Sequence, residues 1–185
     1  MHKWLIDQER MRPSIAEPAI IPLYISKIAE EKMRNHALSK AHEKLEVMGL
    51  MLGQVFNHDG VEYTIVRDVA TTDLDASSTR VRFRRDGFEK LFASMDDVGF
   101  DHLVTGWYHS HPGHGIFMSP TDVDTQKGMF NSSFHRAVVI DPISKEIGAY
   151  RLGSGDVEPV PFVIYWEEYQ NPYFGTTVRK RKLAD

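Results

Sequence analysis

The sequence predicts a single domain of the α/β class, with a mixed, mostly antiparallel sheet flanked by helices. The length of 185 residues fits one domain, whose usual size is roughly 100–200 residues. Segments with the helical spacing of apolar residues are interleaved with shorter apolar segments typical of strands. No internal repeat or low-complexity segment is present. We expect the domain at residues 19–175, between a polar leader at 1–18 and a basic tail at 176–185.

A helix, a hairpin and a second helix are expected in the first half of the sequence. A stripe of apolar residues predicts a helix over residues 25–42, which leads into a buried strand over 47–55. The Asn-His-Asp-Gly turn signal at 57–60 and the alternation over 62–70 make a hairpin with that strand. A second helix is expected over 86–98.

Three further strands and a helix are expected in the second half. The strands at 103–108, 137–140 and 147–152 complete the sheet. A helix begins at Ser119 and Pro120, because serine suits the N-cap and proline suits the first helical position. The segment 153–175 spreads aromatic residues between prolines, and it either packs on the domain or contacts a partner.

Composition excludes several classes of function. A net charge of −4 and a pI near 6.1 provide no global basic field for nucleic acid. The basic run Arg179–Lys182 is interpreted as a solvated tail rather than a localisation or nucleic-acid signal. Without cysteine, a metal must be held by N and O ligands. Neither a secretory signal nor an apolar run of about 18 residues is present, so a cytoplasmic protein with no membrane partner is expected.

Two histidines at the end of a predicted strand carry the main functional signal. Because positions i and i+2 of a strand share one face, His109 and His111 point the same way, and Ser110 points elsewhere. Their backbones lie about 6.5–7 Å apart, a gap that metal–nitrogen bonds of about 2.0–2.1 Å can bridge. Taken alone, such a pair is more often two ordinary polar residues at a strand end.

Asp122 is the third candidate ligand, one turn into the helix that begins at Ser119. Two imidazoles and a carboxylate leave a fourth position open to water, which is typical of a hydrolytic rather than a structural zinc centre. Taken alone, the Ser-x-x-acid pattern is also a capping signature that needs no metal. The combination with the histidines favours the metal.

Glu46 supplies a carboxylate at the junction between the first helix and the buried strand. An ionised carboxylate is costly there without a partner, and a zinc-activated water is a suitable one, since an unligated carboxylate can accept its proton and pass it to a leaving amine. The alternative is that Glu46 only solvates the end of the helix beside Glu43 and Lys44.

These residues together resemble the JAMM (MPN-plus) metalloprotease family, with the greatest likeness to the deubiquitinase of the proteasome lid. The likeness covers roughly residues 22–152 and rests on three groups of residues, namely Glu46–Gly53, Gly106–Gly113, and Ser119 with Asp122 and Gln126. The resemblance implies a single MPN domain of the JAB1/MPN, cytidine-deaminase-like type.

The resemblance also implies a function and the roles of its residues. One Zn²⁺ per chain would be bound by His109, His111 and Asp122, with Glu46 as general acid/base and Ser119 as hydrogen-bond donor to the tetrahedral intermediate. The implied reaction releases ubiquitin or a ubiquitin-like modifier from a target lysine. Two alternatives stay open: a JAMM hydrolase that processes a sulfur-carrier-type precursor, and a non-catalytic MPN scaffold.

Partners of the expected enzyme follow from the same resemblance. In the lid enzyme, long helices after the catalytic domain join it to a sister subunit and to the proteasome. Because this sequence ends before such helices, we expect a freestanding enzyme, as in a prokaryotic ubiquitin-like system, and association with the proteasome is the alternative.

Substrate contacts are expected in the segment 71–85. In the family an insertion at this place pairs with the extended ubiquitin tail by strand addition. Val81 and Phe83 would then lie beside the tail, and Asp73 or Asp75 would meet a tail arginine. An ordinary hairpin loop is the alternative.

Other residues near the candidate site have simpler interpretations. Trp107 and Tyr108 are interpreted as core aromatics, and residues 116–118 as an apolar wall. His114 is interpreted as an exposed turn residue rather than a ligand of a second metal.

Overall fold

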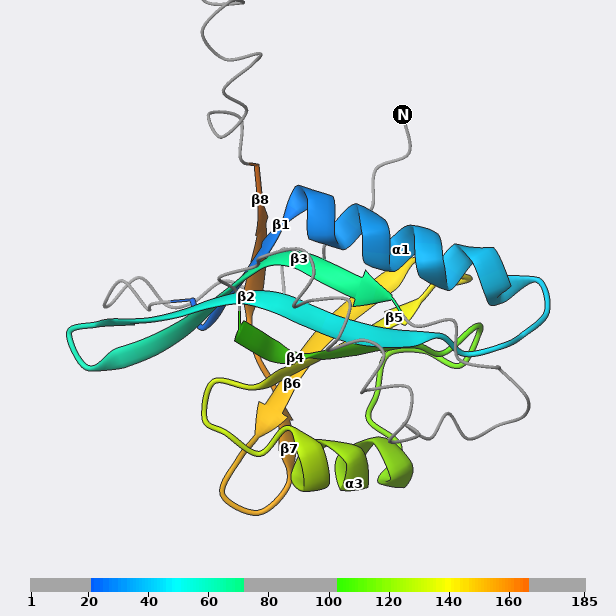
Figure 1. Cartoon of the computed structure of the whole chain (residues 1–185). Helices are drawn as coiled ribbons and strands as arrows, with labels where there is room; N and C mark the ends of the chain where they lie inside the picture. Colours follow the sequence, from blue (N-terminus) through cyan, green and yellow to red (C-terminus); the bar gives the residue numbers. More distant parts are fainter. Residues whose placement is uncertain (1–20, 72–102, 167–185) are drawn as a thin grey trace, which may run out of the picture.

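One mixed sheet with a helix on each face forms the described part of the protein (Figure 1). The computed structural model describes residues 21–71 and 103–166. Within them, the sheet has eight strands in the order β7-β6-β5-β4-β2-β3-β1-β8. The predicted α/β class is confirmed. No helix in these two ranges is long and apolar enough to cross a membrane.

The sheet contains both antiparallel and parallel pairs of strands. Antiparallel pairs are β2–β3, β2–β4, β5–β6 and β6–β7, whereas β1–β3, β1–β8 and β4–β5 are parallel. Four of these seven pairs are therefore antiparallel, as expected. The strands are β1 (Leu23–Ser26), β2 (Met48–His58), β3 (Val61–Thr71), β4 (Leu103–Ser110), β5 (Arg136–Asp141), β6 (Glu146–Leu152), β7 (Val157–Pro159) and β8 (Phe162–Tyr165).

Helix α1 (Lys27–Ala41) covers one face of the sheet. The Ser26 side chain caps it by accepting a hydrogen bond from Ala29 N at 3.1 Å. The apolar stripe that predicted the helix, including Ala29, Met33 and Ala37, packs in one core cluster with sheet residues. The helix begins two residues later than predicted, because Ile25 belongs to β1.

Strand β1 is an element that sequence reasoning missed. Its four residues lie in register with β3 on one side and β8 on the other. Leu23 and Ile25 are fully buried. A strand this short gives too little alternation to be recognised, and its apolar residues merge with the helical stripe that follows.

Helix α3 (Pro120–Met129) covers the opposite face. Its start at Ser119 and Pro120 is confirmed. A second core cluster lies beneath it and includes Leu50, Trp107 and Phe130. Trp107 and Tyr108 are both buried, as predicted, but neighbouring strand positions face opposite ways, and Tyr108 belongs to the cluster under α1.

The predicted β2–β3 hairpin is confirmed. Asp59 and Gly60 form its turn with φ values of 51° and 83°, the left-handed pair that a two-residue hairpin turn requires. The start of the aromatic segment at 153–175 packs on the domain, since β7 and β8 join the two edges of the sheet. The predicted helix at 86–98 and the segment 72–85 lie outside the described residues.

Candidate metal centre

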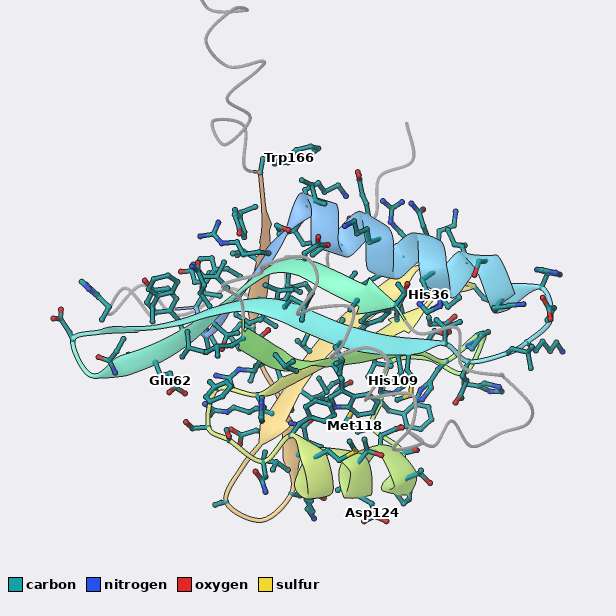
Figure 2. All side chains as sticks on the ribbon, viewed as in Figure 1. His36, Glu62, His109, Met118, Asp124 and Trp166 are labelled. Atoms are coloured by element: carbon teal, nitrogen blue, oxygen red, sulfur yellow. The ribbon has the colours of Figure 1, made fainter. Side chains whose placement is uncertain are left out.

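Three predicted ligands converge between the end of β4 and the start of α3. Asp122 Oδ2 lies 3.4 Å from His109 Nε2 and 3.4 Å from His111 Nε2. One ligand atom from each residue can be chosen so that all lie within 4.8 Å of one another. Figure 2 shows His109 on the α3 side of the sheet, near Met118, whereas His36 lies on the α1 side.

These separations fit a metal ion. Two atoms bound about 2.05 Å from one tetrahedral ion lie about 3.4 Å from each other. The carboxylate oxygen therefore stands at ligand spacing from both imidazole nitrogens. A direct hydrogen bond between these groups would be shorter, because a good N–H···O bond measures 2.7–3.2 Å.

Buried nitrogens without hydrogen bonds give a second sign of a cation site. The imidazole of His109 has both nitrogens buried with no hydrogen-bond partner, and His111 Nδ1 is in the same state. Leaving a buried polar atom unsatisfied costs about 1–3 kcal/mol. A metal bound at His109 Nε2 would satisfy one of these unpaired atoms.

The charge state of Asp122 suits a cation. Burial opposes its ionisation, but the nearby His109 and His111, with Ser119, outweigh burial and hold its pKa well below the usual range. For His111, burial disfavours the charged ring, but the nearby carboxylates of Asp122 and Glu46 still raise its pKa. The site thus concentrates negative potential at the point toward which His109, His111 and Asp122 converge.

Glu46 lies beside the three converging residues but apart from them. It occupies the irregular segment between α1 and β2. Its Oε1 lies 3.9 Å from His111 Nε2, and its side chain is 31% exposed. That distance is too long for a direct hydrogen bond, so the carboxylate is free to act on a water or substrate next to the centre.

Ser119 sits at the junction of the loop and α3. Its hydroxyl accepts a hydrogen bond from Asp122 N at 3.3 Å, while Asp122 Oδ2 accepts from Ser119 N at 2.7 Å. This reciprocal capping box fixes the carboxylate that faces the histidines. Capping uses the hydroxyl only as acceptor, so its proton stays available for donation.

An aromatic stack fixes the plane of His109. The Trp107 ring lies parallel to the His109 ring, with centroids 4.4 Å apart and an interplanar angle of 14°. Trp107 Nε1 donates to Gln126 Oε1 at 2.7 Å, and Gln126 Nε2 donates to Phe130 O at 2.7 Å. Helix α3 is thereby tied to the strand that carries both histidines.

A buried carboxylate holds the loop that follows His111. Asp141, 1% exposed, accepts hydrogen bonds from the backbone nitrogens of Gly113 at 2.9 Å, Gly115 at 2.9 Å, Ile143 at 2.8 Å and Ser144 at 3.3 Å. These bonds outweigh burial and lower the pKa of Asp141. The first part of the connection between His111 and α3 is therefore fixed by Asp141, and the capping box fixes its end.

Sequence reasoning treated Trp107 only as a core aromatic and Gln126 only as part of the family resemblance, and it did not single out Asp141. Trp107 adjoins the histidines and Gln126 lies one turn after Asp122, but their contact depends on how α3 packs on β4. Nothing in the sequence marks Asp141, which ends β5, as a loop anchor.

The remaining predicted residues have different outcomes. His114 is exposed, as expected. Within the predicted apolar wall, Phe117 is 47% exposed and its ring centroid lies 4.8 Å from that of His111. The proposed substrate contacts at Asp73, Asp75, Val81 and Phe83 lie outside the described residues.

Comparisons with known proteins place these features in context. The family described as JAB1/Mov34/MPN/PAD-1 ubiquitin protease matches residues 22–132. The chain is 40% identical over 138 residues to ubiquitin carboxyl-terminal hydrolase RPN11 of Saccharomyces cerevisiae, covering 70% of this chain and 43% of that protein. It is 36% identical over 155 residues to COP9 signalosome complex subunit 5 of Debaryomyces hansenii, covering 80% and 30%.

The chain spans less than half the length of these curated relatives. A solution structure of a protein from Desulfitobacterium hafniense has a similar fold, with a TM-score of 0.58 and 20% identity, covering 78% of this chain and 94% of that one.

Proposed function

Because the chain belongs to the JAB1/Mov34/MPN/PAD-1 ubiquitin protease family, we propose that it is a zinc-dependent isopeptidase. The bond hydrolysed joins ubiquitin, or a ubiquitin-like modifier, to a target lysine. Family membership confirms the resemblance found in the sequence and the single MPN domain. The observation that carries the proposal is the convergence of His109, His111 and Asp122 beside the unligated carboxylate of Glu46.

His109 and His111 would hold the zinc through Nε2, and Asp122 would hold it through Oδ2. When bound, zinc would polarise the scissile carbonyl and lower the pKa of a water at its open position. Trp107 keeps the ring of His109 in place by stacking on it. The capping box keeps the Asp122 carboxylate aimed at the histidines.

Glu46 would act as the general acid/base. Its carboxylate, 3.9 Å from His111 Nε2, is near enough to accept a proton from the attacking water. It then carries this proton to the amine of the departing lysine. Partial exposure of the side chain gives the substrate access to it.

Ser119 would stabilise the oxyanion of the tetrahedral intermediate. Its O–H is not used in capping, since that bond runs from Asp122 N to the Ser119 oxygen. A fixed hydroxyl aimed at the developing negative charge belongs to the donors of oxyanion holes. Capping and catalysis therefore use different parts of one hydroxyl group.

The names of the relatives support the substrate class. RPN11 of S. cerevisiae is named a ubiquitin carboxyl-terminal hydrolase, and a relative in Eremothecium gossypii is named a 26S proteasome regulatory subunit. We therefore propose ubiquitin-type conjugates as substrates and association with a proteasome-like complex as a further expectation.

Cleavage of ubiquitin conjugates by the purified protein tests this function, with zinc content measured in the same samples. One zinc per chain and cleavage that a chelator abolishes and added zinc restores would support the isopeptidase. Zinc without cleavage of any ubiquitin conjugate would reject ubiquitin as the modifier. Failure to bind zinc at saturation would leave the non-catalytic scaffold.

A further inference from the structure

Ser110 lies between the two histidines in the sequence, but it bonds to the segment that carries Glu46. Its side chain is fully buried. The Ser110 hydroxyl accepts a hydrogen bond from Val47 N at 3.0 Å, and Ser110 N donates to Val47 O at 2.9 Å. The hydroxyl and the backbone N–H of Ser110 therefore both bond to Val47, which directly follows Glu46.

This contact lies one residue beyond the paired part of the sheet. The last paired residues of β2 and β4 are Met48 and His109. Beyond them the chain leaves the ladder toward Glu46, and the Ser110 hydroxyl supplies the acceptor for the Val47 N–H. The backbone of Glu46 is thus attached to the strand that carries both histidines.

The Glu46 side chain has little to hold it in place by itself. Its carboxylate is 3.9 Å from His111 Nε2, and the side chain is 31% exposed. The position of the carboxylate relative to the histidines is set instead by its backbone, and Val47 fixes that backbone on one side.

We propose that Ser110 is a positioning residue for Glu46. It holds the base at a fixed distance from the centre formed by His109, His111 and Asp122, and it binds neither metal nor substrate. The proposal rests on the function proposed above. A carboxylate displaced by about 1 Å loses on the order of 100-fold in rate, while the three ligands keep their places.

Thr105 offers a matched control on the same pair of strands. It lies on β4, is fully buried, and its hydroxyl donates to Met51 O of β2 at 3.2 Å. Removing the Thr105 hydroxyl deletes one buried bond to β2, and removing the Ser110 hydroxyl deletes one to Val47, which lies between β2 and Glu46. The variants Ser110→Ala and Thr105→Val thus separate positioning of the base from stability of the sheet.

The experiment measures kcat, KM, zinc content and the melting temperature of the zinc-loaded full chain for both variants. We expect kcat of Ser110→Ala to fall roughly 10- to 100-fold, with KM and zinc content unchanged. Thr105→Val should keep kcat within about threefold at a similar loss of stability. An equal fall in kcat for both variants would overturn the proposal.

Two further variants cover the case in which Ser110→Ala does not fold. Ser110→Cys has a weak acceptor in place of the hydroxyl and should behave like the alanine variant, whereas Ser110→Thr keeps the hydroxyl and should retain kcat. Activity of Ser110→Cys equal to that of the wild type would count against positioning.

Crystallography separates this proposal from the proposed function. If the wild type cleaves no ubiquitin conjugate, ubiquitin is rejected as the modifier, but Ser110 can still be tested by structures of zinc-loaded wild type and variant. The Glu46 carboxylate should move away from the zinc in Ser110→Ala (or Ser110→Cys) and stay in place in Thr105→Val. An unmoved Glu46 would reject the positioning role.

Discussion

Individual carboxylates in this protein owe their roles to their surroundings. Glu46 lies beside the histidines and partly exposed, so it can exchange protons with water and substrate. Asp122 points at two imidazoles and stays ionised. Asp141 is enclosed by backbone N–H groups and organises a loop. The three acidic side chains are thus a proposed base, a candidate ligand and a loop anchor.

Glu46→Gln should abolish turnover and preserve zinc binding. The amide cannot accept the proton of the attacking water, and a lost general base costs about 10²- to 10⁴-fold in kcat. Single-turnover kinetics and zinc analysis provide the measurement. Glu43→Gln is the control, because Glu43 is exposed and pairs with Lys40. Full activity of Glu46→Gln would remove Glu46 from the mechanism.

Asp141→Asn should make stability less dependent on pH. Since folding lowers the pKa of Asp141, its contribution is complete above the ordinary carboxyl pKa of about 3.9 and is lost as pH falls through the lower folded value. The asparagine variant should be less stable by on the order of 2 kcal/mol at pH 6–8, and the difference should shrink below about pH 4.

Urea unfolding from pH 3 to pH 8 measures this difference. Asp156→Asn is the control, because that carboxylate accepts from Val157 N in an exposed turn. A stability difference for Asp141→Asn that persists unchanged at pH 3 would contradict the assignment.

At the scale of elements, the site depends on how α3 is attached to β4. The helix brings Asp122, and the strand brings both histidines. Gln126 joins the two by accepting from buried Trp107 on one side and donating to Phe130 O on the other. The geometry of the centre therefore reflects a packing contact as well as the local motif.

Gln126→Leu should weaken zinc binding. It removes the hydrogen bond between Trp107 Nε1 and Gln126 and loosens α3, and loss of contacts that support metal ligands typically costs 10- to 100-fold in metal affinity. Competition with a chromophoric chelator gives the affinity. Thr125→Val on the same helix removes only a bond to Thr121 O and should bind zinc as the wild type does. Equal affinities of the two variants would show that the attachment is unimportant.

For the whole molecule, features that depend on a few adjacent residues could be predicted from the sequence. Features that depend on contacts between distant segments could not. The hairpin turn at Asp59–Gly60 and the cap at Ser119 follow from a few adjacent residues, and both were anticipated. The structure also brings together His109, His111 and Asp122, whose role as ligands stays a prediction. Strand β1 and the Asp141 anchor depend on partners far along the chain, which no short sequence pattern encodes.

Removal of zinc should lower the thermal stability of the entire domain. An ion bound by β4 and α3 stabilises only the folded state, by about 2.7 kcal/mol at 100 times the dissociation constant. For a domain of this size that amounts to roughly 5–10 °C. Calorimetry with and without EDTA measures the shift, and His111→Ala should show almost none. An equal shift in both proteins would exclude this site as its origin.

Strand β1 has a consequence for the order in which the protein is made. Its residues Leu23–Ser26 bond to β8, Phe162–Tyr165, on one side and to β3 on the other. On the ribosome, β1 emerges before β3, and β8 emerges after the other described strands. At 5–20 residues per second, the interval between β1 and β8 is on the order of 10 s. Until β8 has been made, β1 can pair with at most one of its two neighbours, so one edge of a strand with two apolar core residues stays unpaired during synthesis.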